Sequence, residues 1–492
     1  MCMGGAFAQL VLSTEAPLLG PSFLSNFDPT TSSSMRTALD GSLNRTDLIF
    51  SIDVFSAATN QSIYTYHHIG EEKEAALTAG RLSELTVSRL GSVSKLFTAY
   101  VILVKAGMGI FSEPVTNYLP ELRALNTSMD HLTHIDWEST TIGALAAHQA
   151  GAGGFLAWMR DFTEPGTSAH LVARNILSGP LGLSGVTAAL PTGPGLDVID
   201  RRSLDNESSW GNDLPLQQGG VRGSIADLRA LGLSILNSEL LSPSTTAQWM
   251  KPSSGTGSLV ELVGAPWEIA RLLVPVTAGS NRTRISDLYT KSGGSPDYGA
   301  MFALSPDHGI GFSILVAGGT ASTARWILRD AVGELFIPAA EAAAADNAAR
   351  NLAGTFIAEQ EGTNLTITSL FEDGVDNLGI LGALTFGAPV DIAPRLYPTG
   401  LNSFSKSLSS LYKTDGVFRV VHRIIPQLLP LPSRAAADGG EGGLFDNSRA
   451  WVQAGFYGSA DQVVFTLQDG RLEKVRVTGM EVDFYRAEGG CD

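Results

Sequence analysis

The sequence predicts a protein of mixed α and β structure, α/β (α+β). We expect a first domain with an antiparallel sheet and a helical subdomain, followed by a small C-terminal antiparallel β domain. Three observations support this prediction. The chain has 492 residues, whereas a single hydrophobic core seldom grows beyond roughly 250 to 300 residues. Strand-like patterns near the start return after a helical middle region. The strongest hairpin signal lies close to the C-terminus.

The first predicted strands cover residues 49–57 and 62–68, because both segments are rich in β-branched and aromatic residues and a short polar turn separates them. A helix follows from Ser92 to Ala106 and ends at Gly107. Its apolar residues cover more than one face, so this helix should be deeply buried.

The middle region, 119–249, is predicted to hold mostly helices and loops. Helical periodicity occurs at 141–148, 154–162, 170–177 and 225–237. Ser224 is the expected N-cap of the last helix, with Asp227 three residues later.

Short strands are then expected at 287–291, 300–305 and 311–317, followed by a helix at 321–335. Asp469-Gly470 separates two β-like runs and predicts a two-residue type I′ turn. The predicted organisation is therefore an N-terminal extension, a first domain, an alanine-rich linker and a C-terminal β domain, with the bounds 1–40, 41–337, 338–350 and 351–492.

Composition excludes several classes of function. The formal net charge of -16 disfavours a nucleic-acid partner, which would require a basic surface. No apolar run approaches the roughly 18 to 20 residues that a membrane span needs. The 8 histidines include no His-Glu-x-x-His motif, and the 2 cysteines stand at opposite ends of the chain. We therefore expect neither a metal nor a cofactor.

Six Asn-x-Ser/Thr sequons would accept glycans if the chain entered a secretory lumen: Asn44, Asn60, Asn126, Asn206, Asn281 and Asn364. The apolar start of the chain lacks the positive region of a secretory signal. Secretion and a cytoplasmic location both stay open.

Candidate catalytic residues come from the motif Ser-x-x-Lys, which places a hydroxyl and an amine one helical turn apart on the same face. The amine can then accept the hydroxyl proton as the oxygen attacks a carbonyl. The motif occurs three times, beginning at Ser92, Ser403 and Ser410. Only Ser92 follows a strand-like run, at 85–87, and starts a buried helix, where backbone N–H groups favour developing negative charge.

The alternative for Ser92 is a plain N-cap serine with Lys95 in solvent. A second motif, Lys291-Ser292-Gly293-Gly294, favours the catalytic interpretation. It stands at the end of a strand-like run, where a strand edge can offer an N–H group to an oxyanion. Its lysine could hold a substrate carboxylate.

Together the two motifs resemble the β-lactamase and penicillin-binding-protein family of serine hydrolases. The segment from Leu90 to Thr98 is similar to the first motif of class C β-lactamases, DD-peptidases and related esterases. Further segments are similar in the same order along the chain: Asn117 to Pro120, Ala146 to Gly151, Pro180 to Leu183, and Gly220 to Asp227. The segment Gly264-Ala265-Pro266-Trp267-Glu268 and the β-rich C-terminal region look most like fungal β-lactamase-like proteins.

The resemblance implies a β-lactamase/transpeptidase-like domain in which Ser92 attacks, Lys95 is the base, and Lys291 tunes the site. The N–H groups of Ser92 and Gly294 would form the oxyanion hole beside Ser292 and Gly293. The implied substrate is a small ester, amide or acyl-thioester, which acylates Ser92 before water or a second nucleophile takes the acyl group. Some relatives with this fold act in secondary metabolism.

The sequence departs from the family at one place. The family has a Tyr-x-Asn motif whose phenol relays protons, but no tyrosine occurs here between Tyr118 and Tyr289. Either the protein has lost this element, or the sequence lacks a segment that encodes it. His170 and Tyr298 are the nearest substitutes, and neither is expected to reach Ser92. A catalytically impaired relative with a binding or scaffold role is therefore the alternative function.

Overall fold

The computed structural model describes residues 43, 45–71, 73–125, 135–151, 174–187, 199, 220–275, 283–295, 297–358, 364–367, 392–402, 416–428 and 462–487. The described residues form two compact units that divide between Ala342 and Ala343. The larger unit combines helices with an antiparallel sheet, and the smaller has its own antiparallel sheet. The predicted fold class is confirmed.

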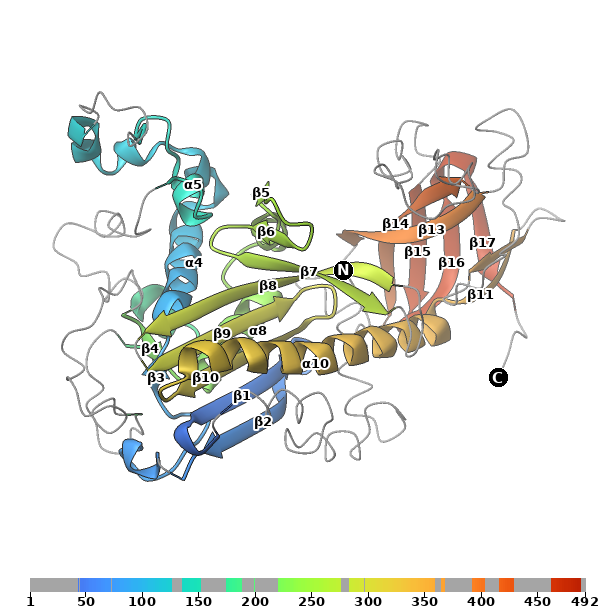
Figure 1. Ribbon diagram of the computed structural model, residues 1–492. Helices are drawn as coiled ribbons and strands as arrows, with labels where there is room; N and C mark the ends of the chain where they lie inside the picture. Colours follow the sequence, from blue (N-terminus) through green and yellow to red (C-terminus); the bar gives the residue numbers. More distant parts are fainter. Residues whose placement is uncertain are drawn as a thin grey trace, which may run out of the picture. The chain divides into compact units, whose positions relative to one another are not determined.

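The larger unit is built on an eight-stranded sheet in the order β2-β1-β10-β9-β8-β7-β6-β5 (Figure 1). The predicted hairpin at its edge is confirmed, since β1 and β2 pair in antiparallel register. The predicted central strands are also confirmed and are longer than expected. The strands are β1 Ile49–Ser56, β2 Gln61–Ile69, β5 Ser254–Gly255, β6 Glu261–Val263, β7 Glu268–Pro275, β8 Thr283–Ser295, β9 Tyr298–Ser305 and β10 Ile310–Ala317.

Helices α4 (Ser94–Ala106) and α8 (Ile225–Leu236) pack against this sheet through one large apolar core. The predicted cap of α8 is present as a full capping box between Ser224 and Asp227. Gly232 lets α8 approach the sheet closely, since a Cβ atom there would lie 2.3 Å from the Phe55 ring. This shared core packs α4 against one face of the sheet.

The remaining elements of this unit are short. The strand predicted at 85–87 is shifted, because β3 covers Ser88–Arg89 and pairs with β4, Arg222–Gly223. The helices predicted at 154–162 and for most of 170–177 lie outside the described residues. The other elements are η1 Arg45–Asp47, η2 Glu74–Ala76, η3 Gly91–Val93, η4 Met108–Ser112, η5 Val115–Asn117, η6 Pro120–Leu125, α5 Ile142–Ala146, η8 Arg174–Ser178 and α9 Pro243–Trp249.

Helix α10 runs from Ala321 to Asn351, so it does not end at Leu335 as predicted. It continues through Pro338 and the whole segment expected to be a linker. Alanine has the highest helix propensity, which favours helix across 339–345 despite the proline. None of the helices within the described ranges is long and apolar enough to span a bilayer.

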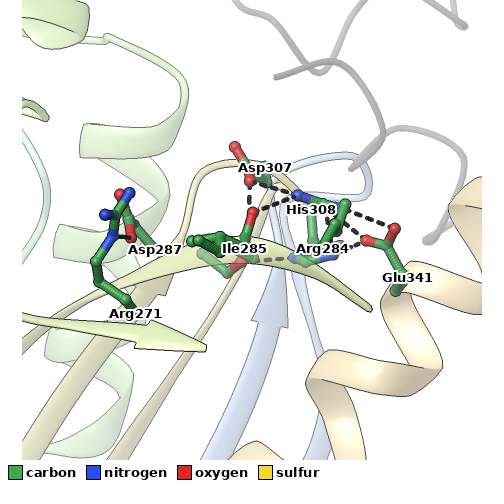
Figure 2. A network of polar contacts seen from close by, with 9 residues as sticks. Arg271, Arg284, Ile285, Asp287, Asp307, His308 and Glu341 are labelled. Carbon is green, nitrogen blue, oxygen red and sulfur yellow. Dashed lines mark hydrogen bonds and ion pairs between the residues drawn. The ribbon is translucent and has the colours of Figure 1, made fainter. Parts of the chain in front are cut away.

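A partly buried polar network joins α10 to the sheet near Glu341 (Figure 2). Arg284 on β8 donates from Nε to Glu341 Oε1 at 2.7 Å and from Nη1 to Asp307 Oδ2 at 3.0 Å. The His308 imidazole lies between the Ser305 hydroxyl, at 2.6 Å, and Glu341 Oε2, at 2.8 Å. Burial alone would raise the pKa of Glu341, but hydrogen bonds from His308 and Arg284 outweigh it and hold this pKa below its ordinary value.

The smaller unit is a seven-stranded antiparallel sheet in the order β12-β11-β17-β16-β15-β14-β13. Its core is an apolar cluster that includes Phe356, Phe465 and Phe484. The predicted hairpin is confirmed, and Asp469 and Gly470 both have the positive φ that a type I′ turn requires. The elements are β11 Gly354–Ala358, β12 Asn364–Ile367, β13 Ile392–Asn402, β14 Val417–Leu428, β15 Gln462–Gln468, β16 Arg471–Val477, η13 Thr478–Met480 and β17 Val482–Arg486.

Candidate active site

Ser92 lies in the short turn η3, two residues before Ser94, which is the first residue of α4. Gly91 adopts a φ of 52°, a left-handed conformation that glycine takes without the penalty of a Cβ atom. The turn therefore brings Ser92 to the N-terminal end of a buried helix. The positive end of the helix dipole stabilises negative charge at this position.

Lys95 contacts Ser92 as the Ser-x-x-Lys spacing predicts. Its Nζ atom donates to Ser92 Oγ at 2.8 Å. Burial and the positive charge of Lys291 lower the pKa of Lys95 to about 8, although Glu268 acts in the opposite direction. No side-chain hydrogen bond caps the start of α4 at Val93. This geometry differs from an N-cap serine with a solvated lysine.

Strand β8 offers an open edge beside the Ser92 turn. Its pairing with β7 begins at Thr290, opposite Glu268, whereas its pairing with β9 continues to Ser295. The segment Lys291–Ser295 therefore has a strand neighbour on one side only. The other side of this segment faces the turn that carries Ser92.

Glycines allow the turn and the strand to approach backbone to backbone. A Cβ atom at Gly91 would lie 2.5 Å from the amide nitrogen of Gly294. A Cβ atom at Gly293 would lie 2.0 Å from the carbonyl oxygen of Leu90 and 3.1 Å from the amide nitrogen of Ser92. Any larger residue at Gly91 or Gly293 would push Ser92 away from the strand.

The same edge supplies N–H groups. The amide of Ser292 donates to Glu268 Oε2 at 2.8 Å, so it points away from β9. Amide directions alternate along a strand, so the Gly294 amide, two residues later, points to the same edge. The backbone N–H groups of Ser92 and Gly294 thus lie close to each other, on the turn and on the facing strand edge. An oxyanion hole requires two such donors close together.

Lys291 is the second lysine of the site, and its side chain is only 3% exposed. Its ammonium group donates to Glu268 Oε1 and to the carbonyl oxygen of Ser292. Burial alone would raise the pKa of Glu268, but the Lys291 charge and the hydrogen bonds from Lys291 and Ser292 hold it below its ordinary value. Glu268 is therefore an ionised member of the site.

Sequence reasoning did not identify Glu268 as a site residue, although it ends the Gly264-to-Glu268 segment that carried part of the resemblance. His148, in the Ala146-to-Gly151 segment, is also close to the site. Burial lowers its pKa, and the charges of Lys291 and Lys95 lower it further. A neutral imidazole thus lies within electrostatic range of both lysines.

The phenol expected from the family is not supplied by either tyrosine nearest the second motif. Tyr289 donates its hydroxyl to the carbonyl oxygen of Met250 at 2.6 Å, and Tyr298 donates to that of Ile199 at 2.9 Å. Each of these hydroxyl protons is thus already used in a hydrogen bond to a backbone carbonyl oxygen. His170 lies outside the described residues.

Other predicted residues fall in different places. Ser403 and Ser410 lie outside the described residues, as do the sequon positions Asn44, Asn126, Asn206 and Asn281. Asn60, in the β1–β2 turn, and Asn364, at the start of β12, are both exposed. Glycosylation at these positions remains a prediction.

Comparison with known proteins supports the resemblance to β-lactamases. Residues 58–181 match the family model described as Beta-lactamase, a range that includes Ser92 and Lys95. Residues 344–488 match the model described as Beta-lactamase-like-like, C-terminal domain, which corresponds to the smaller unit.

A "Beta-lactamase-like protein" of Arthroderma benhamiae is 26% identical over 528 residues, covering 86% of this chain and 84% of that protein. Among solved structures, the class C β-lactamase from Rhodobacter sphaeroides matches with a TM-score of 0.44 and 17% identity. That match covers 62% of this chain and 99% of the other. The resemblance predicted from the motifs is confirmed by the family models and the curated relative.

Proposed function

We propose that this protein is a serine hydrolase or acyltransferase that forms an acyl-enzyme at Ser92. The observation that carries the proposal is the 2.8 Å contact between Lys95 Nζ and Ser92 Oγ beside the open edge of β8. A nucleophile, a base of lowered pKa and two backbone donors then belong to one site. The Beta-lactamase match over residues 58–181 supports this class of chemistry.

Acylation begins when the neutral amine of Lys95 accepts the Ser92 hydroxyl proton. The Ser92 oxygen attacks the carbonyl carbon of an ester, amide or thioester. The negative charge on the carbonyl oxygen then meets the N–H groups of Ser92 and Gly294. One such donor typically contributes about 2.7–4 kcal/mol to the transition state.

Collapse of the tetrahedral intermediate breaks the bond to the leaving group, which takes a proton. The Lys95 ammonium formed in the first step is the nearest identified proton source for an alcohol. Water or a second alcohol or amine then attacks the acyl-enzyme, with Lys95 accepting its proton, and Ser92 is restored. The choice between water and another acceptor distinguishes a hydrolase from an acyltransferase.

A catalytically impaired relative with a binding or scaffold role is the second candidate. The observation that favours it is the lack of any tyrosine between Tyr118 and Tyr289 in the sequence. A protein without the phenol could retain the fold and bind a ligand without turning it over. The two candidates differ in whether Ser92 is chemically reactive.

A fluorophosphonate probe separates the candidates, because it reacts covalently with activated serines. We expect the purified protein to be labelled and Ser92→Ala to lose the label. Ser403→Ala and Ser410→Ala carry the same change in the two other Ser-x-x-Lys motifs and should keep it. A folded wild-type protein that is not labelled would support the binding role, and loss of label in Ser403→Ala or Ser410→Ala would move the site.

A further inference from the structure

The Lys291 ammonium already has an anionic partner within the protein. The second motif would leave this cation available for a substrate carboxylate. Instead Glu268 Oε1 accepts from it, the Ser292 carbonyl oxygen accepts a second hydrogen bond at 3.0 Å, and the Lys291 side chain is 3% exposed. The other oxygen of Glu268 accepts from the Ser292 amide at 2.8 Å. Lys291 and Glu268 therefore neutralise each other.

A second cation, Arg325 on α10, lies against the end of β8. Gly294 on β8 and Gly299 on β9 are opposite each other in the sheet. A Cβ atom at Gly299 would lie 3.3 Å from Arg325 Cβ, and one at Gly294 would lie 2.9 Å from Arg325 Nη1. The two glycines thus let the arginine side chain lie along the strands. Its guanidinium group comes to rest beside the residue whose amide is the second oxyanion donor.

The guanidinium group of Arg325 has donors that the protein does not use. Its Nε and Nη1 atoms are buried, and neither has a hydrogen-bond partner in the part of the chain that the structure describes. Arginine keeps its charge in proteins, and a buried charged donor without an acceptor is costly. The Trp326 ring, centred 5.2 Å from Arg325 Cζ, attracts the charge through its face but does not replace an acceptor oxygen. The side chain as a whole is partly exposed, so a ligand has access to it.

The charges around Ser92 also favour an anion. Among the described residues, three cations, Lys95, Lys291 and Arg325, surround the single anion Glu268. Burial lowers the pKa of Arg325, and the charge of Glu268 opposes this effect from a distance. Because Glu268 already forms an ion pair with Lys291, Arg325 is the cation whose charge is least compensated.

We propose that Arg325, and not Lys291, binds an anionic group of the substrate, a carboxylate a few bonds from the reacting carbonyl. The inference rests on the proposed acyl transfer at Ser92. A planar carboxylate matches the guanidinium group and can accept two parallel hydrogen bonds from it. The reacting carbonyl oxygen would accept from the Gly294 amide, and the guanidinium group lies beside the same residue. The carboxylate therefore belongs close to the reacting carbon, on the acyl part or on the leaving group.

Two pairs of esters test this proposal, and in each pair a carboxamide of similar shape replaces the carboxylate. The p-nitrophenyl esters of m-carboxybenzoate and m-carbamoylbenzoate carry the group on the acyl part, whereas m-acetoxybenzoate and m-acetoxybenzamide carry it on the leaving group. We expect the wild-type kcat/KM to be at least about 10-fold higher for the anionic member of one pair, which identifies the part that carries the anion. Arg325→Gln should reduce this preference by about 10-fold, mainly by raising KM for the anionic ester.

Arg329→Gln is the matched control. Arg329 lies one turn later on α10, its Cζ atom is 4.8 Å from the centre of the same Trp326 ring, and it already pairs with Asp330. The substitution removes the same charge from the same helix, so it should leave the preference for the anionic ester unchanged.

A wild type without an anionic preference in either pair overturns the inference, whether or not Arg325→Gln folds. So does an undiminished preference in an active Arg325→Gln protein. If turnover is too slow to compare the esters, isophthalate should protect Ser92 from the fluorophosphonate at a lower concentration than isophthalamide does, and equal protection overturns the inference. Absence of both turnover and labelling contradicts the proposed function itself, whereas a labelled Ser92 without an anionic preference contradicts only the role of Arg325.

Discussion

Lys95 Nζ lies 2.8 Å from Ser92 Oγ, and burial together with the charge of Lys291 lowers the pKa of Lys95 to about 8. Only the neutral amine can accept the serine proton, and a lowered pKa means that this form appears at a lower pH than for an ordinary lysine. We therefore expect kcat/KM for an activated ester to rise with pH through about 8 and then level off. The pH dependence of kcat/KM is measured with stopped or continuous assays from about pH 6 to pH 10, corrected for spontaneous hydrolysis of the ester.

Lys291→Gln tests the cause of this shift. Removing a nearby positive charge should raise the pKa of Lys95, so the midpoint of the profile should move to higher pH. Lys251→Gln changes the charge of an exposed lysine and should leave the midpoint in place. A flat profile between about pH 7 and pH 9 would show that Lys95 is not the base.

The contact between the Ser92 turn and β8 predicts an effect of Gly293→Ala. The new Cβ atom would meet the Leu90 carbonyl oxygen at 2.0 Å, so the turn or the strand must move. Displacement of the oxyanion donors should reduce kcat by about 10² or more. Gly255→Ala is the matched control, since no atom lies within 4 Å of its added Cβ. Wild-type kcat in Gly293→Ala would mean that the turn and the strand need not be in contact during the reaction.

Local patterns predicted the parts of the site that are close together in the sequence. Ser92 and Lys95 are three residues apart on one helical turn, and the glycines after Lys291 follow it directly, so spacing alone was informative. Glu268 was missed because it joins the site through the register between β7 and β8, where it is opposite Thr290. Register depends on long-range strand pairing, which no local pattern specifies. His148 was missed for a similar reason, since only tertiary packing brings it near two lysines.

The predicted end of α10 at Leu335 was wrong for a different reason, since the helix continues to Asn351. Pro338 favours a helix end, because proline removes one hydrogen bond and clashes with the preceding turn. The alanine-rich segment after it favours helix, and Glu341 is fastened to Arg284 and His308 on the sheet side. Those partners come from β8 and from the turn before β10, so the sequence near Pro338 contains no sign of them.

This network predicts a stability effect for Glu341→Ala. The substitution leaves Arg284 and the fully buried His308 without their shared acceptor. Removing one partner of a largely buried ion pair strongly destabilises the folded protein, but the partial exposure of Arg284 reduces this effect. We therefore expect the free energy of unfolding to fall by about 2–4 kcal/mol. Chemical denaturation followed by tryptophan fluorescence measures it. Glu334→Ala, at an exposed position of the same helix, should cost about 0.5 kcal/mol or less. Equal effects of the two substitutions would mean that the network does not fasten α10.

The lack of a phenol between Tyr118 and Tyr289 predicts which leaving groups the protein can expel. An activated aryl alcohol leaves with little need of a proton, whereas an amine must be protonated as the bond breaks. Absence of one general acid or base typically costs about 10² to 10⁴ in rate, and the Tyr289 and Tyr298 hydroxyls are bound to backbone carbonyls. We therefore expect slow turnover of an aryl ester that Ser92→Ala abolishes, and no detectable turnover of the matched amide.

His148→Gln should then leave the rate for the ester nearly unchanged, because that leaving group needs no relay. Fast turnover of both substrates would show that another proton relay exists. In that case a selective loss of amide turnover in His148→Gln, with ester turnover retained, would identify the imidazole near Lys95 and Lys291 as that relay.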